Sequence, residues 1–478
     1  MLDAWLLRGD QMHPPSMLDD LNLSDDGRPL YQRLADAIAA RIVSGELAKG
    51  DKLPPQRALA RTFGINVTTV TRALSTLRMR GLLETRAGGG TLVASCDPGE
   101  TRSFASSPSQ ELDIIDLSVN RPATPAYLDV LSLLLPHLAR SPHFSTLQDY
   151  HPPEGPVWAR VAIARWIASV AGDGDPGRVV VTAGAQHALD SVLKAIAGRG
   201  DVVLADEVTY QGIGALCRMH GLNLVGIGMD RAGMLPEALD LACMRFRPRA
   251  VFLVPTLHNP TTITLDEKRR RNLAAIARRH NVLIIEDDVY RPFYIDPPPS
   301  LASIEPELTV YVGGLSKCVA PGIRLGFVVA PRAIAGQISA CLRINCWSIS
   351  PLTALVATQI IESGDIDRII AMQREELRLR QVILCELLSP LDVQTHPTST
   401  HAWLRVPDPW RGASFARACM ERGVAVLPGD AFAVGREPVQ HGVRINVGAA
   451  RSREDLRAAL SMMARIFEAG HLQLPGFV

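Results

Sequence analysis

Several common features are missing from this 478-residue sequence. Its 50 Lys and Arg residues are balanced by 49 Asp and Glu residues, which excludes a polycation but still allows one basic domain on a neutral body. No stretch is apolar and long enough to cross a bilayer. The first eight residues carry an acid, Asp3, and lack a basic region followed by an apolar core, so we expect neither a signal peptide nor a membrane anchor.

Cysteine is present, but without a motif. None of the eight cysteines forms a Cys-x-x-Cys pair, so the Cys and His spacing of a zinc finger is missing. We therefore expect neither a metal site nor a disulfide framework. Scattered cysteines in a chain of this length suit a reducing compartment, and we expect a cytoplasmic protein.

The composition, 47% hydrophobic and 21% charged, is that of a globular protein, and the length predicts two to four domains. We expect an N-terminal arm over residues 1–24, in which Met12 and Met17 are alternative starts. Ser, Pro and Gly without periodicity predict a flexible linker over residues 95–112. This leaves a small domain at 25–94 and a large domain at 113–478.

The small domain is basic, with 11 Lys and Arg residues against 6 Asp and Glu residues between positions 24 and 94. Its pattern predicts three helices and a hairpin. Leu30, Leu34, Ile38 and Ile42 form one apolar stripe of a first helix. Pro54-Pro55 opens a second helix that stops at Gly64, and Asn66 caps a third that closes at Gly81. Residues 82–84 and 91–93 flank a glycine turn and predict a β-wing.

This order of elements is typical of a winged helix-turn-helix, whose third helix enters the major groove of DNA. A small helical protein-binding module is the alternative interpretation. In the DNA-binding interpretation Arg57, at the start of the second helix, reaches a phosphate or a guanine edge. The candidate DNA-binding residues are Arg57, Thr68, Thr69, Thr71, Arg72 and Gly90.

In the large domain, short apolar strands alternate with helices, which predicts an α/β domain with a buried, mostly parallel sheet. We expect one helix over residues 188–197, with Leu189, Val192, Leu193 and Ile196 on one face. Ligands of such sheets bind beyond the carboxyl ends of the strands, so the polar residues there are the candidates for a site. The predicted strands are 179–182, 202–205, 250–254, 282–285, 309–312 and 325–329.

Each polar strand end has an ordinary explanation when it is taken alone. Gly184-Ala185-Gln186 is a structural turn or an anion site at a helix N-terminus. Tyr210 packs in the core or in a loop, Asn259 belongs to a turn, and Asp287 is a helix cap or a metal ligand. A lone lysine such as Lys317 is usually solvated. The remaining candidates at strand ends are Tyr290, Ser316 and Arg324.

Taken together, the motifs resemble two known families. The segments Leu30-Tyr-Gln-Arg-Leu-Ala, Gly50–Ala60, Thr69–Ala73 and Gly89–Val93 resemble the GntR-type DNA-binding domain. Residues 113–450 resemble a fold-type I aminotransferase with a small C-terminal subdomain, most specifically in Ser316-Lys317 followed by Pro321-Gly-Ile-Arg324-Leu-Gly. The combination resembles the MocR-type subfamily of regulators. It implies pyridoxal 5′-phosphate (PLP) as the cofactor and a homodimer with shared sites.

The aminotransferase resemblance implies a role for each strand-end residue. Lys317 forms the internal aldimine with PLP, and Asp287 pairs with the pyridinium nitrogen. Tyr210 stacks on the ring, while Tyr290 and Asn259 bind its phenolic oxygen. The residues implied to hold the phosphate are Gly184, Ala185, Gln186, Ser316, Arg324 and, from the partner subunit, Tyr150. Arg444 grips the carboxylate of an effector or substrate.

Three positions depart from the family patterns. Val67 stands where many GntR-type domains carry an arginine that contacts DNA. Gly314 replaces a hydroxyl residue that touches the phosphate three positions before the lysine. Thr261-Thr262 follows the Asn-Pro pair where Thr-Gly is common. None of these changes removes a group that the aldimine chemistry needs.

Two functions remain open at this stage. One is a PLP-dependent transcriptional regulator that senses PLP or an amino-containing effector by aldimine exchange at Lys317 and keeps at most a residual transaminase half-reaction. The other is a working aminotransferase with a DNA-binding appendage. A structural DNA-packaging protein would not need a cofactor pocket. The effector, operator sequence and repeat geometry, and activation or repression are not readable from the residues.

Overall fold

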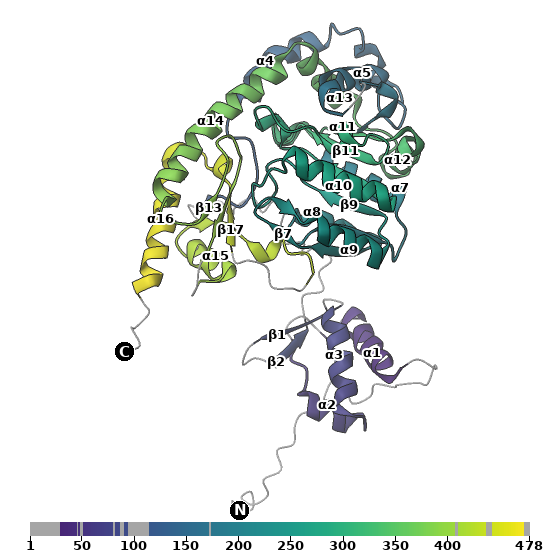
Figure 1. Cartoon of the computed structure of the whole chain (residues 1–478), viewed down its shortest axis with the longest axis vertical. Helices are drawn as coiled ribbons and strands as arrows, with labels where there is room; N and C mark the ends of the chain where they lie inside the picture. The colour runs from purple at the N-terminus through teal and green to yellow at the C-terminus, as the bar shows by residue number, and fades with distance from the viewer. Residues whose placement is uncertain are drawn as a thin grey trace, which may run out of the picture. The chain divides into compact units, whose positions relative to one another are not determined.

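The computed structural model describes residues 29–44, 46–47, 51–79, 82–86, 90–93, 114–171, 174–406, 410–435 and 442–472. The chain divides into two compact units, Met1–Ser106 and Ser107–Val478, which we describe separately (Figure 1). The predicted arm at 1–24 and linker at 95–112 lie outside the described residues. Within these residues no helix is apolar and long enough to cross a membrane.

The N-terminal unit has the predicted three helices and hairpin. Leu34, Ile38, Leu59, Val70 and Leu74 are almost fully buried, so the apolar stripes of the helices form one core. The hairpin is antiparallel and pairs Leu83 with Val93, while its turn at 87–89 lies outside the described residues. The elements are α1 (Leu30–Ser44), α2 (Gln56–Thr62), α3 (Val67–Met79), β1 (Leu83–Arg86) and β2 (Gly90–Val93).

The second unit is built around a seven-stranded sheet in the order β4-β12-β11-β10-β9-β5-β6. All neighbouring pairs are parallel except those of β12, which runs antiparallel to both β11 and β4. The sheet is therefore mostly parallel, as predicted. Its strands are β4 (Val179–Thr182), β5 (Val202–Asp206), β6 (Asn223–Ile227), β9 (Ala250–Leu253), β10 (Leu283–Asp287), β11 (Thr309–Gly314) and β12 (Gly326–Val329).

Alternate residues of β5, β9 and β10 enter two different apolar cores, which explains why these strands are apolar throughout. Phe252 and Ile285 pack on the side of α7, α8, α12 and α13, whereas Val251 and Ile284 pack on the side of α9, α10 and α11. The covering helices are α7 (Ala185–Ile196), α8 (Gln211–His220), α9 (Pro236–Phe246), α10 (Glu267–His280), α11 (Leu301–Ile304), α12 (Arg332–Cys346) and α13 (Pro351–Glu362). Further elements before and between them are α4 (Ala126–Leu138), α5 (Val157–Trp166), α6 (Ala168–Ala171), β7 (Met229–Asp230) and β8 (Gly233–Met234).

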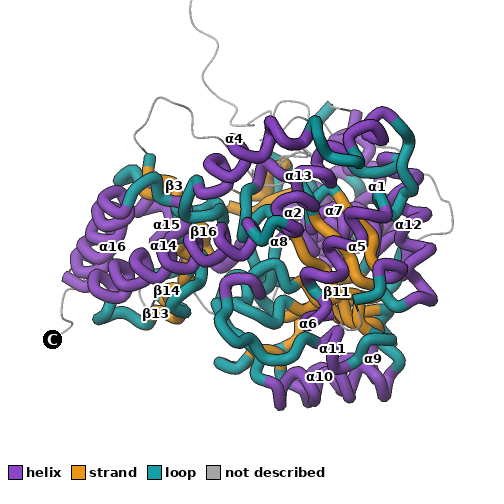
Figure 2. Tube along the Cα trace, turned by 90° about the horizontal axis from the view of Figure 1, so that it is seen from above, coloured by secondary structure: helices purple, strands orange, loops and turns teal. Residues whose placement is uncertain are grey.

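A smaller antiparallel sheet, in the order β13-β14-β17-β16, forms the expected C-terminal subdomain. Figure 1 shows α14 and α16 running along this sheet, and Figure 2 shows the subdomain at one end of the unit. A short strand, β3 (Ile115–Asp116), pairs with β15 (Val424–Ala425) and so ties the start of the unit to its end. The remaining elements are β13 (Val393–Gln394), β14 (Ala402–Arg405), β16 (Leu427–Pro428), β17 (Gly442–Ile445), α14 (Asp365–Leu388), α15 (Gly412–Met420) and α16 (Arg453–Leu472).

The structure differs from the sequence-based expectation in the bounds of several elements and in one additional strand of the large sheet. The helix expected at 188–197 spans Ala185–Ile196, because it starts directly after Gly184, which has a φ of 91° that suits glycine. The edge strand β6 was not predicted, since its residues are largely half-buried and polar at their start. The strand expected at 282–285 extends to Asp287.

Candidate functional site

Polar residues from separate strands converge at one edge of the large sheet. Asp287 ends β10 and Lys317 follows β11 by three residues, so both lie at the carboxyl ends of parallel strands. Arg324 precedes β12, and because β12 runs antiparallel its beginning lies at that same edge. The single reversed strand therefore explains how a residue before a strand joins residues that follow other strands.

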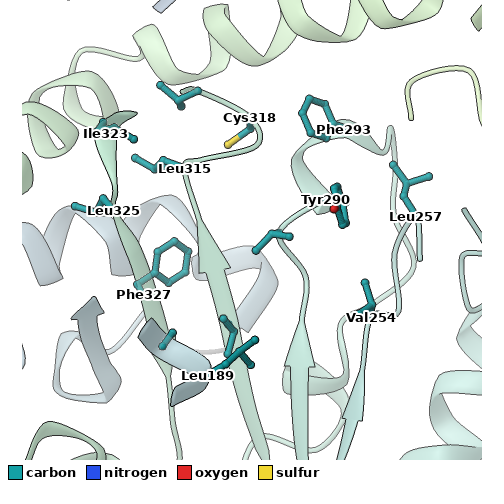
Figure 3. Close-up of a cluster of buried hydrophobic side chains, with 14 of the residues drawn as sticks. Leu189, Val254, Leu257, Tyr290, Phe293, Leu315, Cys318, Ile323, Leu325 and Phe327 are labelled. Atoms are coloured by element: carbon teal, nitrogen blue, oxygen red, sulfur yellow. The ribbon is translucent and has the colours of Figure 1, made fainter. Parts of the chain in front are cut away.

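Lys317 lies in a loop whose neighbours are anchored in the core. Leu315 and Cys318 are fully buried (Figure 3). Ser316 and Lys317 are half-buried. The Nζ atom of Lys317 donates a hydrogen bond to the Asn120 carbonyl oxygen at 2.8 Å. Burial, and then the positive charge of Arg444, lower the pKa of Lys317 to about 8. The amine is thus much closer to its neutral, nucleophilic form at pH 7 than a solvated lysine.

Asp287 is 5% exposed, and its Oδ1 atom has no hydrogen-bond partner among the described residues. Burial raises the pKa of this carboxyl to about 7, against the opposing effects of the Val289 backbone N–H and the Lys317 charge. A buried acceptor without a donor is costly, so the site is incomplete as a purely structural arrangement. A cationic ring N–H placed at Oδ1 would satisfy it.

Two tyrosines flank this carboxyl. The hydroxyl of Tyr290 accepts a hydrogen bond of 2.8 Å from the side-chain amide of Asn120. The hydroxyl of Tyr210, at the N-cap of α8, donates to Gln186 Oε1 at 2.9 Å. Burial raises the pKa of both tyrosines, so both remain neutral phenols at physiological pH.

The start of α7 forms an anion cradle. Gly184 has φ 91° and ψ 165°, a conformation that is essentially restricted to glycine, and the next residues present the free backbone N–H groups of a helix N-terminus. Arg324 lies beside them and donates to the Ala183 carbonyl oxygen at 3.2 Å. A Cβ atom at Gly326 would lie 2.5 Å from the Gly184 carbonyl carbon, so this second glycine allows β12 to pass directly beneath the cradle.

Arg444 lies on β17 of the small sheet and faces the same region. It is 4% exposed, and its Nη1 atom donates to Asn259 Oδ1 at 2.8 Å. Its guanidinium carbon is 4.9 Å from the centre of the Phe432 ring. Its Nε has no partner among the described residues, so the group still has donor capacity for a carboxylate. The contact with Asn259 also links the small sheet to the loop after β9.

The surface of α3 carries the candidate DNA contacts. Thr68, Thr71 and Arg72 are exposed, Thr69 is half-buried, and Arg57 is exposed on the first turn of α2. Asn66 caps α3 as predicted, since its Oδ1 accepts the Thr68 N–H at 3.0 Å. Two candidates also have internal partners. Thr71 donates to Gln56 Oε1 at 2.8 Å, and the guanidinium of Arg72 lies 4.9 Å from the centre of the Tyr31 ring. Gly90 begins β2.

A family model described as aminotransferase class I and II matches residues 112–463. The chain belongs to this family. A second model, described as bacterial regulatory proteins of the gntR family, matches residues 30–93. The aminotransferase domain of this chain therefore follows an N-terminal gntR-family domain, which is the domain combination of the MocR-type subfamily.

Relatives share both parts of the chain. YdeF of Bacillus subtilis (strain 168), an uncharacterized HTH-type transcriptional regulator, is 27% identical over 92% of this chain and 95% of its own length. PtsJ of Salmonella typhimurium, a vitamin B6 salvage pathway transcriptional repressor, is 28% identical over 90% of this chain and 96% of its own. The solved structure of an archaeal alanine:glyoxylate aminotransferase matches with a TM-score of 0.69 at 23% identity, over 74% of this chain and 91% of that one, which supports the fold.

The cofactor of this aminotransferase-family domain is PLP, and the chain's own residues fit it. The unpaired Asp287 oxygen suits a pyridinium N–H, the cradle at α7 suits a phosphate, and Lys317 supplies an amine of lowered pKa between them. When bound, PLP supplies an aldehyde that forms a Schiff base with an amine and a ring that accepts electrons.

Three residues that contact this cluster were not predicted from the sequence. Asn120 contacts both Lys317 and Tyr290, and the Ser118 carbonyl oxygen accepts a hydrogen bond from Arg444. Fully buried His401 has its ring centre 5.3 Å from that of Tyr290, and burial, then the charge of Arg444, lower its pKa to about 3. A polar cluster after the short strand 115–116 was the available signal for Asn120. No feature of the sequence around His401 indicates that it contacts this cluster.

The structure shows the surroundings of two positions that depart from the family pattern. Thr262, where glycine is common, adopts φ 63°, a left-handed conformation that is unusual for a β-branched residue. Its hydroxyl donates to the Thr261 carbonyl oxygen at 2.6 Å, which partly offsets that strain. At Gly314 a Cβ atom would meet nothing closer than 3.5 Å, so the missing side chain at this position is not a steric requirement.

Tyr150 lies outside this cluster. Its side chain is 87% exposed, and its ring centre is 5.5 Å from that of Trp347. Ile344, at the end of α12, is 88% exposed, and Leu128 and Leu133 of α4 are also largely exposed. Among the described residues the ring contact of Tyr150 is with Trp347, and its assignment to the partner's phosphate site stays a prediction.

Proposed function

We propose that this protein is a cytoplasmic, PLP-dependent transcriptional regulator that binds double-stranded DNA as a homodimer. Its winged helix-turn-helix contacts DNA. Its aminotransferase-like domain senses PLP, an amino-containing effector or both, through exchange of the amine that occupies the cofactor at Lys317. An effector changes DNA binding only if it favours one arrangement of the dimer over another, so differential affinity is required.

One observation carries this proposal: a gntR-family head and a cofactor-type pocket with an unpaired buried carboxylate occur in one chain. An enzyme does not need the gntR-family DNA-binding domain, and a simple DNA-binding protein does not need a cofactor pocket. PtsJ, which is named a vitamin B6 salvage pathway transcriptional repressor, aligns over 90% of this chain, and this supports the proposal.

In this proposal each residue has a defined task. Lys317 holds PLP and yields it to an incoming amine, Asp287 pairs with the ring nitrogen, and Arg444 binds an acidic group of the effector. Tyr210 stacks on the ring, and Tyr290 and Asn259 bind its phenolic oxygen. The phosphate is held by Gly184, Ala185, Gln186, Ser316, Arg324 and the partner's copy of Tyr150. The DNA is contacted through Arg57, Thr68, Thr69, Thr71, Arg72 and Gly90.

A working aminotransferase is the second candidate. It is favoured by the presence together of Lys317, Asp287 and Arg444, with the amine pKa lowered to about 8. Steady multiple turnover with an amino acid and a keto acid, well above the rate of free PLP, would support this candidate over a sensor.

The deciding experiment follows two signals in the full-length holoprotein. We would titrate it with amino acids, taurine and polyamines, recording the visible spectrum and the affinity for DNA upstream of its own gene. The expected result is a spectral change with one compound class that also changes DNA affinity. Lys317→Ala should abolish the spectral response, whereas Lys268→Ala, an exposed lysine of α10, should not. No preference for that DNA over random DNA would refute the regulator.

A further inference from the structure

Asn120 contacts both Lys317 and Tyr290, and it is only 8% exposed. Its backbone carbonyl oxygen accepts a hydrogen bond of 2.8 Å from the Lys317 Nζ atom. Its side-chain Nδ2 atom donates to the Tyr290 hydroxyl oxygen, also at 2.8 Å. A hydroxyl that accepts one hydrogen bond still has its own proton to donate. The direction of the bond between Asn120 and Tyr290 therefore decides where the Tyr290 proton can go.

The ring of His401 has one defined arrangement of its proton. The ring is fully buried, and burial, then the charge of Arg444, lower its pKa to about 3, so it is neutral and carries a single N–H. Its Nε2 atom lies 3.1 Å from the His258 carbonyl oxygen, which can only accept, so the N–H is at Nε2. The Nδ1 atom is then an acceptor. It faces the Thr400 hydroxyl at 3.1 Å and Asn120 Nδ2 at 3.5 Å.

Only one orientation of the Asn120 amide agrees with this ring. With Nδ2 directed at His401, the amide donates toward two acceptors, His401 Nδ1 and the Tyr290 oxygen. In the reversed orientation Asn120 Oδ1 would face the lone pair of Nδ1, and two acceptors would oppose each other in a buried space. Asn120 Oδ1 has no partner among the described residues, so the amide is not held from its other end. His401 therefore keeps Asn120 a donor to Tyr290.

The electrostatics of Tyr290 agree with this direction. Burial raises the pKa of Tyr290, and the hydrogen bond from Asn120 opposes that effect, which makes the hydroxyl a better donor. The other charged or titratable groups that act on Tyr290 and Lys317 are Arg444, Asp287, Tyr210, Arg324 and Arg121. They stay in place when Asn120 is replaced, so a change in such a variant does not come from their loss.

We propose that Asn120 and His401 are positioning residues, which keep the hydroxyl proton of Tyr290 directed at the phenolic oxygen of PLP. This role rests on the proposed place of PLP at Lys317, but not on DNA binding. A donor at the phenolic oxygen stabilises the negative charge that this oxygen carries when the nitrogen between Lys317 and PLP loses its proton. Asn120 and His401 therefore lower the pKa of that nitrogen.

The test is a pH titration of the visible absorption of the full-length holoprotein, whose midpoint reports this pKa. Asn120→Ala should raise the midpoint by about 0.5–1 unit, which corresponds to one hydrogen bond of ordinary strength. His401→Leu should raise it by less, because the Asn120 amide still reaches Tyr290 but is no longer oriented. Asn223→Ala, at an exposed position of β6, is the control and should leave the midpoint unchanged.

A double-mutant cycle with Tyr290→Phe separates positioning from a structural or a direct electrostatic effect. Tyr290→Phe should itself raise the midpoint. Adding Asn120→Ala to it should then change the midpoint by less than about 0.3 unit, because the hydroxyl that Asn120 orients is gone. Additive shifts would overturn the proposal, and so would an unchanged midpoint in Asn120→Ala or His401→Leu.

If Asn120→Ala fails to fold, Asn120→Asp keeps the shape and replaces the donor by an acceptor. The new carboxylate takes the Tyr290 proton, so the midpoint should rise more with Tyr290 present than in the Tyr290→Phe background. An equal rise in both backgrounds would mean a direct effect of charge and would overturn the proposal. A wild-type protein with no visible band that depends on Lys317 would refute the proposed place of PLP as well, whereas a normal band with an unmoved midpoint refutes the positioning role alone.

Discussion

Asp287 is the residue whose ionisation links the stability of the protein to its cofactor. Its pKa in the folded chain is about 7, against about 3.9 for an unperturbed aspartate. The folded state therefore favours the protonated acid. This contribution to stability is fully present below about pH 4 and is lost as the pH rises through about 7.

The first prediction concerns Asp287→Asn, which removes the ionisation and keeps the shape. Without PLP, the variant should gain stability over wild type progressively between pH 4 and 7, reaching about 2–4 kcal/mol at pH 8. With PLP the order should reverse, because the variant cannot form the charged pair with the ring nitrogen. Thermal melting of both forms at several pH values measures this. Asp149→Asn, at an exposed position, is the control, and a gain that is the same at pH 5 and pH 8 would contradict the argument.

The second prediction concerns Gly314, which lacks the hydroxyl that the family pattern places near the phosphate. A Cβ atom here would sit 3.7 Å from the Ala185 backbone nitrogen, within the cradle. We expect Gly314→Ser to bind PLP about tenfold more tightly, through one additional hydrogen bond to a charged group. Gly314→Ala adds the same carbon without the hydroxyl and should leave PLP affinity near that of wild type. Equal affinities for the serine and alanine variants, measured by fluorescence titration of the apoprotein, would rule out the hydroxyl as the cause.

At the scale of elements, the sequence predicted most of what positions the site. Strands with apolar residues on both faces were recognisable, because both faces are buried by helices, and the polar residues that follow them were recognisable as strand ends. The contribution of β3 and of Asn120 could not be recognised from the sequence. It depends on the pairing of β3 with β15, which lies more than 300 residues later. The same holds for His401, which only the packing of the small sheet against the loop of Asn259 brings to Tyr290.

The third prediction concerns the first turn of α2. Arg57 is exposed there and has no hydrogen-bond or ion-pair partner among the described residues, whereas Arg72 is held over Tyr31. Arg57→Ala should therefore weaken binding to all DNA sequences and reduce the slope of log affinity against log salt by about 1. Arg465→Ala, an exposed arginine of α16, removes the same charge elsewhere and should leave the slope unchanged.

A matched variant separates contact from folding in the same domain. Asn66→Ala removes the side chain that caps α3 and should destabilise the N-terminal unit by about 1 kcal/mol. Its DNA affinity should be restored at lower temperature, while that of Arg57→Ala should not. An unchanged salt slope for Arg57→Ala would show that this residue does not neutralise a phosphate.

At the scale of the whole molecule, we place the interface of the proposed homodimer at the exposed apolar residues near Tyr150. Tyr150 contacts Trp347, Ile344 lies three residues before Trp347 at the end of α12, and each is at least 47% exposed. Scattered apolar residues need no explanation, but a group of them beside an exposed tyrosine is typical of an interaction surface, which supports the proposed dimer. The proposed dimer would cover this surface and bring Tyr150 to the partner's cradle.

The fourth prediction distinguishes association from the tyrosine itself. Ile344→Asp places a charge in the interface and should yield a monomer that binds PLP about tenfold more weakly, because the partner's Tyr150 is lost with the partner. Tyr150→Phe should remain a dimer and show much of the same loss, since only its hydroxyl can bond the phosphate. Sedimentation gives the mass and fluorescence titration gives the PLP affinity. A monomeric Ile344→Asp with the PLP affinity of wild type would mean that each chain completes its own site, and the shared-site dimer would have to be abandoned.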